Sequence, residues 1–309
     1  MTEYSKKILV LADGSERSLK TVQYLCSSLP PDEFRVVLFH VFDPVPECYW
    51  DLENQPGKKE AIRQLRSWEE QKRKHIENFM ENARTLFVNS GFDPSSVKIK
   101  IRNRQAGIAR DIVKEAETGY GAVAMARHGF GALVSFSMGS VASKLFSKIG
   151  VIPLIIVGDS PLNKKILLAL DGSESSEKMA EFVGLYIGGS DHEVMLFHVI
   201  RGFDAVIPEC PDLKIPIDRF ELARMEMETF FDGLKEKLVR AGLDHAKISQ
   251  KIVSGEFSRA GAIIREAREN GCSAIAVGRR GISNVEAFLL GRVSNKVIHG
   301  GSHQTVWVV

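Results

Sequence analysis

Two segments of the chain carry glycines at a spacing that suits a phosphate-binding loop. The first is Ala126-Arg-His-Gly129, followed after nine residues by Gly139 and Ser140, and the second is Gly278-Arg-Arg-Gly281, followed after nine residues by Gly291 and Arg292. Glycine lets the backbone approach anionic oxygens and leaves N–H groups accessible to them. A helix expected after the last glycine adds its positive N-terminal end, and Ser140 adds a hydroxyl donor. The pattern therefore predicts a site for a phosphate chain.

An aspartate follows an apolar run at two other places, Asp13 in Asp-Gly-Ser and Asp171 in a second Asp-Gly-Ser. A carboxylate at a strand end can accept a hydrogen bond from a ribose hydroxyl, as acidic residues do in other nucleotide-binding folds. We expect the backbone at Val41 or Val199, which end the next strand, to contact the edge of an adenine. A simpler interpretation is that Asp13 and Asp171 only cap the helices that follow them.

These residues recur because the chain contains a duplicated unit. The sequence KILVLADGSE at 7–16 returns as KILLALDGSE at 165–174, and LFHV at 38–41 returns at 196–199. The repeated unit has roughly 150 residues, a typical domain length. We expect two domains, residues 1–158 and 164–309, joined by a short linker with the turn residues Pro161 and Asn163.

The elements that position these residues alternate between strands and helices. Short apolar runs predict strands at 7–12, 34–41, 97–102, 121–126 and 152–157, and at 165–170, 193–200, 246–253, 273–277 and 305–309. Helical spacing predicts helices at 15–27, 58–90, 108–117 and 140–149, and at 174–187, 218–241, 258–270 and 290–299, with a long loop at 44–57. The alternating lysines of 97–102 are typical of an edge strand.

This alternation predicts an α/β fold of two tandem, doubly wound sandwiches, each with a five-stranded parallel sheet. In such a sheet a ligand binds at the carboxyl ends of the strands, where the winding direction reverses. That point lies between the first and fourth strands. It brings Asp13 toward Gly129 in the first half and Asp171 toward Gly281 in the second.

The composition excludes several classes of protein. The 41 Lys and Arg against 39 Asp and Glu leave a net charge of +2, which provides no electrostatic footprint for nucleic acid. The apolar runs are too short to span a membrane, and residues 1–7 contain no signal-peptide core, so we expect a cytoplasmic protein. The four cysteines lack zinc-site spacing, so no metal site is expected. The sequence Pro-Glu-Cys occurs in the corresponding loop of each half and ends at Cys48 and Cys210. Common ancestry of the two loops explains this, and the alternative is that the two thiols form a redox or metal-binding pair.

With these motifs in both halves, the chain resembles a tandem universal stress protein. The resemblance rests on Gly-x2-Gly-x9-Gly after the fourth strand and on an aspartate after the first, and it extends over nearly the whole chain. It implies an adenine nucleotide α-hydrolase-like fold and binding of ATP or another adenine nucleotide, with or without Mg²⁺. It also implies that the final strands of the two halves pair as an internal pseudo-dimer, through residues 153–157 and 305–309.

Neither half matches the family pattern completely. Ala126 stands where the first half should have glycine, and Arg292 replaces Ser or Thr in the second half. If the backbone at Ala126 needed a left-handed conformation, its side chain would cost about 1 kcal/mol. Arg292 either clamps a phosphate or fills the phosphate space. On the glycine argument we expect the second half to be the better site, with Arg279 and Arg280 adding positive charge nearby.

Two functions follow as hypotheses. The first is an ATP-binding regulatory protein with little or no hydrolysis, since no catalytic triad or P-loop sequence is present. The second is an interaction module that no longer binds nucleotide. A third, less favoured class is an enzyme that uses the adenylate-type fold for chemistry. His40 and His198 lie within strands, which favours structural roles. The sequence leaves open whether the whole chain forms a homodimer and whether it binds another protein.

Overall fold

The computed structural model describes residues 5–50, 58–127, 145, 152–159, 162–200, 217–279, 291–301 and 303–309. The first half contains β1 (Lys7–Leu11), α1 (Glu16–Ser28), β2 (Arg35–Phe42), α2 (Glu47–Trp50), α3 (Lys59–Asn89), β3 (Val97–Asn103), α4 (Ile108–Ala116), β4 (Ala122–Ala126) and β5 (Leu154–Val157). The second half contains β6 (Lys165–Ala169), α6 (Glu174–Ile187), β7 (Glu193–Ile200), α7 (Ile217–Arg240), η3 (His245–Lys247), β8 (Ile248–Ser254), α8 (Arg259–Glu269), β9 (Ala274–Val277), α9 (Arg292–Gly300) and β10 (Thr305–Val308).

The predicted elements that fall in the described residues are present, with small differences at their ends. Two details were wrong. The segment predicted as a loop at 44–57 contains the short helix α2, whose turn begins with a hydrogen bond from the Tyr49 N–H to the Pro46 carbonyl. Residues 245–247, partly assigned to a strand, form the 3-10 turn η3, which is capped by the Asp244 side chain. The helix predicted at 140–149 lies outside the described residues apart from Leu145.

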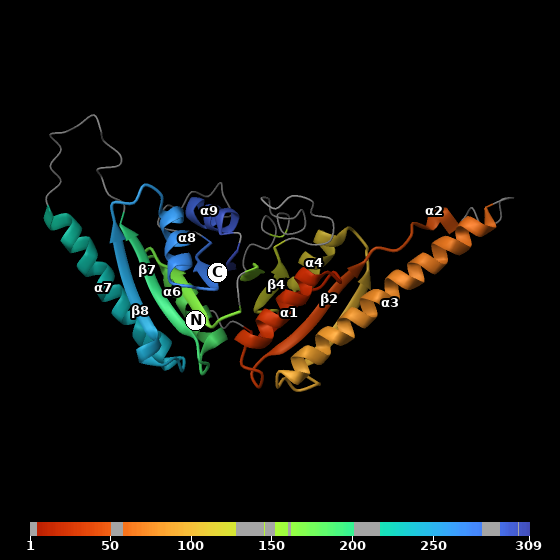
Figure 1. Ribbon diagram of the computed structural model, residues 1–309, viewed down its shortest axis with the longest axis horizontal. Helices are drawn as coiled ribbons and strands as arrows, with labels where there is room; N and C mark the ends of the chain where they lie inside the picture. Colours follow the sequence, from red (N-terminus) through yellow and green to blue (C-terminus); the bar gives the residue numbers. More distant parts are fainter. Residues whose placement is uncertain are drawn as a thin grey trace, which may run out of the picture.

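The strands of both halves form one ten-stranded sheet in the order β3-β2-β1-β4-β5-β10-β9-β6-β7-β8. Strands within each half are parallel, whereas β5 and β10 pair antiparallel, with Trp307 opposite Ile155. The α/β class and the pairing of the final strands are thus as expected. This pairing joins the five strands of each half edge to edge. Figure 1 shows the two halves side by side, with α3 and α7 at opposite ends of the molecule.

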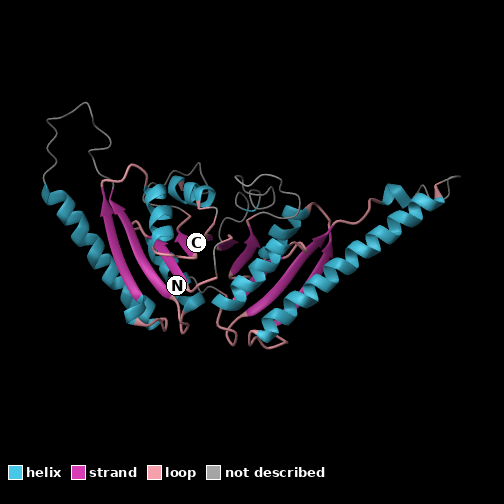
Figure 2. Cartoon of the chain, viewed as in Figure 1, coloured by secondary structure: helices cyan, strands magenta, loops and turns pink. Residues whose placement is uncertain are grey.

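Helices cover both faces of this sheet, which explains why its inner strands, such as β1 and β6, are continuously apolar. On one face, alternate strand residues such as Ile8 and Val10 share a core with buried residues of α1, α3, α6 and α7. On the other face, Leu9 packs in a second core with residues of α4, α8 and α9. Each core contains residues of both halves, so the layers continue across the β5–β10 junction (Figure 2).

Trp307 of β10 stabilises the junction between the halves, in the core that also contains Ile8 and Val10. Its ring is 1% exposed, and its Nε1–H donates to the Tyr24 hydroxyl of α1 at 2.9 Å. Phe182 of α6 packs edge-on against the same ring, with centroids 5.9 Å apart. One buried side chain thereby contacts the first helix of each half.

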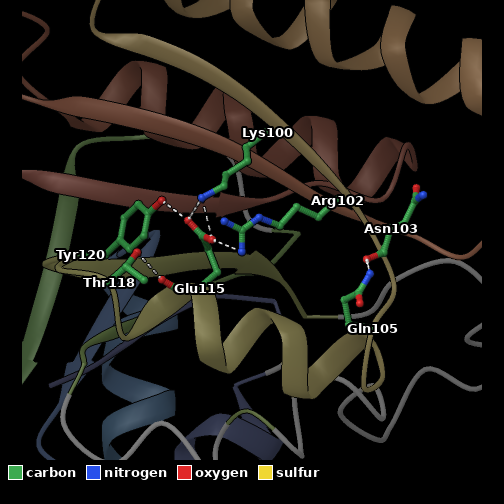
Figure 3. Close-up of polar contacts among 7 residues, drawn as sticks. All are labelled: Lys100, Arg102, Asn103, Gln105, Glu115, Thr118 and Tyr120. Carbon is green, nitrogen blue, oxygen red and sulfur yellow. Dashed lines mark hydrogen bonds and ion pairs between the residues drawn. The ribbon is translucent and has the colours of Figure 1, made fainter.

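The edge strand β3 is tied to α4 by a buried carboxylate (Figure 3). Glu115 is completely buried and accepts hydrogen bonds from Lys100 at 2.7 Å and from the Tyr120 hydroxyl at 2.7 Å. Arg102 lies 3.1 Å from its other oxygen. The second half repeats this contact between Glu266 and Lys251. The alternating cations that predicted an edge strand therefore also bind the helix that covers it.

Candidate functional site

The strand order reverses at the same point in each half. In the first half, β1 leads outward to β2 and β3, and the chain then crosses to β4 on the other side of β1. In the second half, β6 leads to β7 and β8 before the chain crosses to β9. Asp13 and Asp171 follow β1 and β6, while Arg127 and Gly278 follow β4 and β9. The sheet thus brings together the strand ends at which ligands bind in this class of fold.

Asp171 is held in a fixed turn at the end of β6. Its Oδ1 accepts hydrogen bonds from the Ser173 N–H at 3.1 Å, the Ser173 hydroxyl at 2.6 Å and the Ser176 hydroxyl at 2.8 Å. The helix N-cap is Ser173, whose side chain accepts from the Ser176 N–H. All these bonds to Asp171 end on one oxygen, so they fix the orientation of the carboxylate.

Asp13 has a similar turn at the end of β1. Its Oδ1 accepts from the Ser15 N–H at 3.0 Å and the Ser15 hydroxyl at 2.6 Å, and Ser15 is the N-cap of α1. Gly14 has φ 84 and Gly172 has φ 78, a left-handed conformation that suits glycine. The simpler interpretation, that each aspartate is itself the helix cap, was wrong, because serine is the cap and aspartate holds the serine.

The strand histidines support these turns. The Nδ1 atoms of His40 and His198 lie 2.7 Å from the carbonyl oxygens of Ala12 and Leu170, the residues just before each aspartate. Burial lowers the pKa of both imidazoles, so each is neutral at physiological pH and its Nδ1–H donates to the carbonyl. This arrangement fits the structural role expected from the sequence. Val41 and Val199 each lie one residue before the end of their strand rather than at its end.

In the second half, the N-terminus of α9 is anchored to the end of β9. The Gly291 N–H donates to the Arg279 carbonyl at 2.6 Å, and the Ser294 hydroxyl donates to the Gly278 carbonyl at 2.5 Å. Gly291 is the N-cap and Arg292, which is exposed, is the first residue of α9. The start of this helix therefore lies beside the strand ends where the crevice was predicted.

Several predicted residues lie outside the described part of the chain, namely Gly129, Gly139, Ser140, Arg280, Gly281 and Cys210. Cys26, Cys48 and Cys272 are free thiols. Among the described residues, no group of three or more His, Cys, Asp or Glu side chains is arranged to hold a metal ion. No helix in the described ranges is both long and apolar enough to cross a membrane.

The backbone penalty expected at Ala126 does not arise. Ala126 is the last residue of β4 and pairs with Val157, and no described residue other than glycine has a positive φ. Backbone strain at Ala126 therefore does not distinguish the nucleotide sites of the two halves. The departures from the family pattern that still distinguish them are the extra methyl group of Ala126 and the replacement of a small hydroxyl residue by Arg292.

The arginine after each fourth strand contacts the other half of the protein. Arg279 is 8% exposed, and its Nη2 donates to the carbonyl of Ile152 in the first half. Arg127 is 7% exposed and contacts carbonyl oxygens of the second half. Sequence reasoning did not single out Arg127, although arginine occupies the same position in both repeats.

Comparison with known proteins agrees with this architecture. A profile of the universal stress protein family matches residues 5–157 and again residues 162–309. The chain is 31% identical over 141 residues to the universal stress protein YxiE of Bacillus subtilis, an alignment that covers 43% of this chain and 90% of the relative. The crystal structure of a universal stress protein from Archaeoglobus fulgidus has the same fold, with a TM-score of 0.60, 18% identity and 98% of each chain covered. The chain therefore belongs to the universal stress protein family and carries the family's unit twice.

Proposed function

We propose that this protein is a cytoplasmic stress-response regulator that binds ATP or a related adenine nucleotide, principally in its second half, and hydrolyses it slowly or not at all. The observation that carries the proposal is the presence of two groups at the ends of the neighbouring strands β6 and β9. One is the oriented carboxylate of Asp171, and the other is the N-terminus of α9 with exposed Arg292.

Each group suits a different part of a nucleotide. A carboxylate with a fixed orientation accepts hydrogen bonds from ribose hydroxyls. The first N–H groups of a helix have no partners within the helix, and with the helix dipole they favour phosphate oxygens. Arg292 adds a cation that can bind phosphate in a bidentate manner. The backbone near Val199, on the neighbouring strand β7, is the expected contact for the adenine.

Slow hydrolysis follows from the state of the side chains near this point. His198 is neutral and its Nδ1–H is used by the Leu170 carbonyl, while Asp171 is engaged by two serines. A general base must reach the attacking water and hold a suitable pKa. Neither side chain is arranged as a dedicated base, so nucleotide binding rather than turnover is the proposed activity. When Mg²⁺ accompanies ATP, it would be held mainly by the phosphates and water.

The first test is the nucleotide content of protein purified without dialysis. The protein is denatured, and released nucleotide is identified by chromatography with mass detection and counted per chain. Stripped protein is then titrated with ATP and Mg²⁺ by calorimetry. About one ATP or ADP per chain supports one working half, and two support both. No released nucleotide and no heat of binding would refute the proposal.

Asparagine variants of the two aspartates identify the half that binds. Asparagine keeps the oxygen that holds the serine turn and replaces the second carboxylate oxygen by an amide. Asp171→Asn is expected to weaken ATP binding by about ten-fold or more, since a hydrogen bond to a charged group contributes about 1.5–3 kcal/mol. Asp13→Asn is the matched control. If only Asp13→Asn weakens binding, the site belongs to the first half.

The second candidate function is an interaction module without nucleotide. The departures at Ala126 and Arg292 favour it, because an added methyl group or a guanidinium occupying the phosphate position would oppose binding. In that case the protein would act through a protein partner or a homodimer. Absence of nucleotide together with an intact fold would support this alternative.

A further inference from the structure

The side chain of Arg127 crosses from the first half of the protein to the second. It follows β4, and its Nη1 donates to the carbonyl of Ile298. Its Nη2 donates to the carbonyls of Gly301 at 2.9 Å and Gln304 at 3.1 Å. One guanidinium thus joins the last turn of α9, the residue just after it and the segment leading into β10.

The Ile298 carbonyl is one of those that a helix leaves unsatisfied at its C-terminal end, and Gly301 is the C-cap of α9. The last carbonyls of α9 lack partners within the helix and form the negative end of its dipole. A cation at this end is favourable, and a planar guanidinium can bind several oxygens at fixed angles. Arg127 therefore fixes both the position and the direction of α9.

The opposite end of α9 lies at the proposed phosphate site. The helix has nine residues, and its start is attached to β9 through Gly291 and Ser294. A rotation of so short a helix at its C-terminal end would displace the N–H groups at its start. From this geometry we propose that Arg127 of the first half is a positioning residue for the nucleotide site of the second half. The proposal rests on the proposed function and adds that the site is completed by the other half.

The equivalent arginine makes the reciprocal contact. Arg279 follows β9, and its Nη2 donates to the carbonyl of Ile152, two residues before β5. Ile152 follows the predicted helix 140–149 of the first half, just as Gln304 follows α9. The same device thus operates in both directions across the β5–β10 junction, and each half holds the segment that leads into the last strand of the other.

The burial of Arg127 indicates that this side chain does more than fill space between the two halves. Burial lowers the pKa of its guanidinium to about 10, which reflects the cost of removing the charge from water. An apolar side chain would fill the same volume without that cost. What it would lack are directed donors to carbonyls of separate segments, and these donors fix the orientation of α9.

The test uses the full chain with Asp13→Asn in the background, so that only the second site is measured. Arg127→Met removes the charge and the donors, and Arg127→Lys keeps the charge with fewer directed donors. Tyr24→Phe, which removes a different hydrogen bond at the junction between the halves, is the control for general destabilisation. ATP affinity is measured by calorimetry, and hydrogen exchange is measured at the amides of residues 295–298, which bond within α9. We expect Arg127→Met to weaken ATP binding at least ten-fold, Arg127→Lys to restore part of it, and Tyr24→Phe to leave it unchanged.

The exchange measurement separates this proposal from the proposed function. If the parent protein binds no ATP, the proposed function fails, and faster exchange at 295–298 in Arg127→Met than in Tyr24→Phe still supports the positioning role. Equal losses of affinity and protection in Arg127→Met and Tyr24→Phe would indicate general destabilisation and overturn the proposal. Unchanged exchange in Arg127→Met would also overturn it.

Discussion

Replacing Glu115 by glutamine is expected to lower the free energy of unfolding by about 2 kcal/mol at pH 7. The carboxylate is completely buried between α4 and β3. Oε1 accepts from Lys100 and Tyr120, while Oε2 accepts from Lys100 at 2.8 Å and faces Arg102. A glutamine amide must direct its NH₂ group toward at least one cation in either orientation, so the substitution replaces attraction by repulsion.

The magnitude follows from the number of bonds and the exposure of the partners. A hydrogen bond to a charged group contributes about 1.5–3 kcal/mol, and glutamine weakens two such contacts. The cations are partly exposed, Lys100 by 34% and Arg102 by 49%, so both can turn toward water when the carboxylate is removed. This relaxation and screening reduce the loss to about 2 kcal/mol, below the cost of stranding a fully buried charge.

The assay is urea unfolding followed by circular dichroism, with Glu266→Gln as the matched variant. Glu266 has the equivalent place in the second half, where Lys251 donates to both carboxylate oxygens and the side-chain amide of Asn270 also donates to Oε1. With one cation instead of two, Glu266→Gln is expected to cost about 1 kcal/mol. A loss below about 0.5 kcal/mol for Glu115→Gln, or a larger loss for Glu266→Gln, would refute the reasoning.

The dependence on pH provides a second check on Glu115. Burial alone would raise its pKa, but the hydrogen bonds from Lys100 and Tyr120 and the charges of Lys100 and Arg102 hold the pKa below its ordinary value. The folded state therefore releases this proton more readily than the unfolded chain. The stabilisation is complete above the unfolded pKa and disappears as the pH falls through the folded one. The difference between the parent and Glu115→Gln should shrink in acid, and a difference that grows would contradict the assignment.

Three further predictions concern other buried contacts. Tyr24→Phe removes the acceptor of the Trp307 Nε1–H and should cost about 1–3 kcal/mol in urea unfolding with a change in tryptophan fluorescence; unchanged values would exclude this bond as a link between the halves. Gly14→Ala and Gly172→Ala should each cost about 1 kcal/mol or more through left-handed strain. Gly14→Ala should cost more, because its Cβ would lie 2.9 Å from a methyl carbon of α3, against 3.3 Å from one of α7 at Gly172; equal midpoints in thermal unfolding would contradict this. Burial lowers the pKa of His192 from 6.5 to about 4, so the unfolded chain binds the proton first and stability falls as pH decreases between these values. His192→Gln should flatten that fall in urea titrations at pH 7 and pH 5, and an unchanged slope would argue against a neutral buried imidazole.

Periodicity and apolar runs were sufficient to predict the strands and helices of this fold. A fully buried parallel strand such as β1 or β6 leaves a continuous apolar run, and the helices leave their own spacing. The joining of the two sheets required knowledge of the family, because an apolar final strand gives no sign of what lies on its open edge. The turn at α2 was missed because four residues are too few to establish a helical period.

The candidate site was less predictable, because its decisive contacts are between residues far apart in the sequence. Asp171 and Asp13 were recognised from their position after a strand, which is a local signal. The role of Arg127 depends on carbonyls of Ile298 and Gly301, and backbone acceptors carry no signature in the sequence. The available clue was the repeat itself, since Arg127 and Arg279 occupy equivalent positions.

A single chain with two units can differ between its halves where a symmetric dimer cannot. At the junction, Trp307 faces Ile155 across the antiparallel strands, and it contacts Tyr24 on one side and Phe182 on the other. Tyr24 and Phe182 are equivalent positions in the repeat, but only a tyrosine offers the hydroxyl that the indole N–H requires. Two copies of either unit alone would place like side chains opposite one another and lose this complementary set. The junction is therefore specific for one half against the other, which keeps each arginine facing the partner segment it holds. If nucleotide binds mainly to the second half, the same asymmetry lets the first half support that site instead of providing a second nucleotide site.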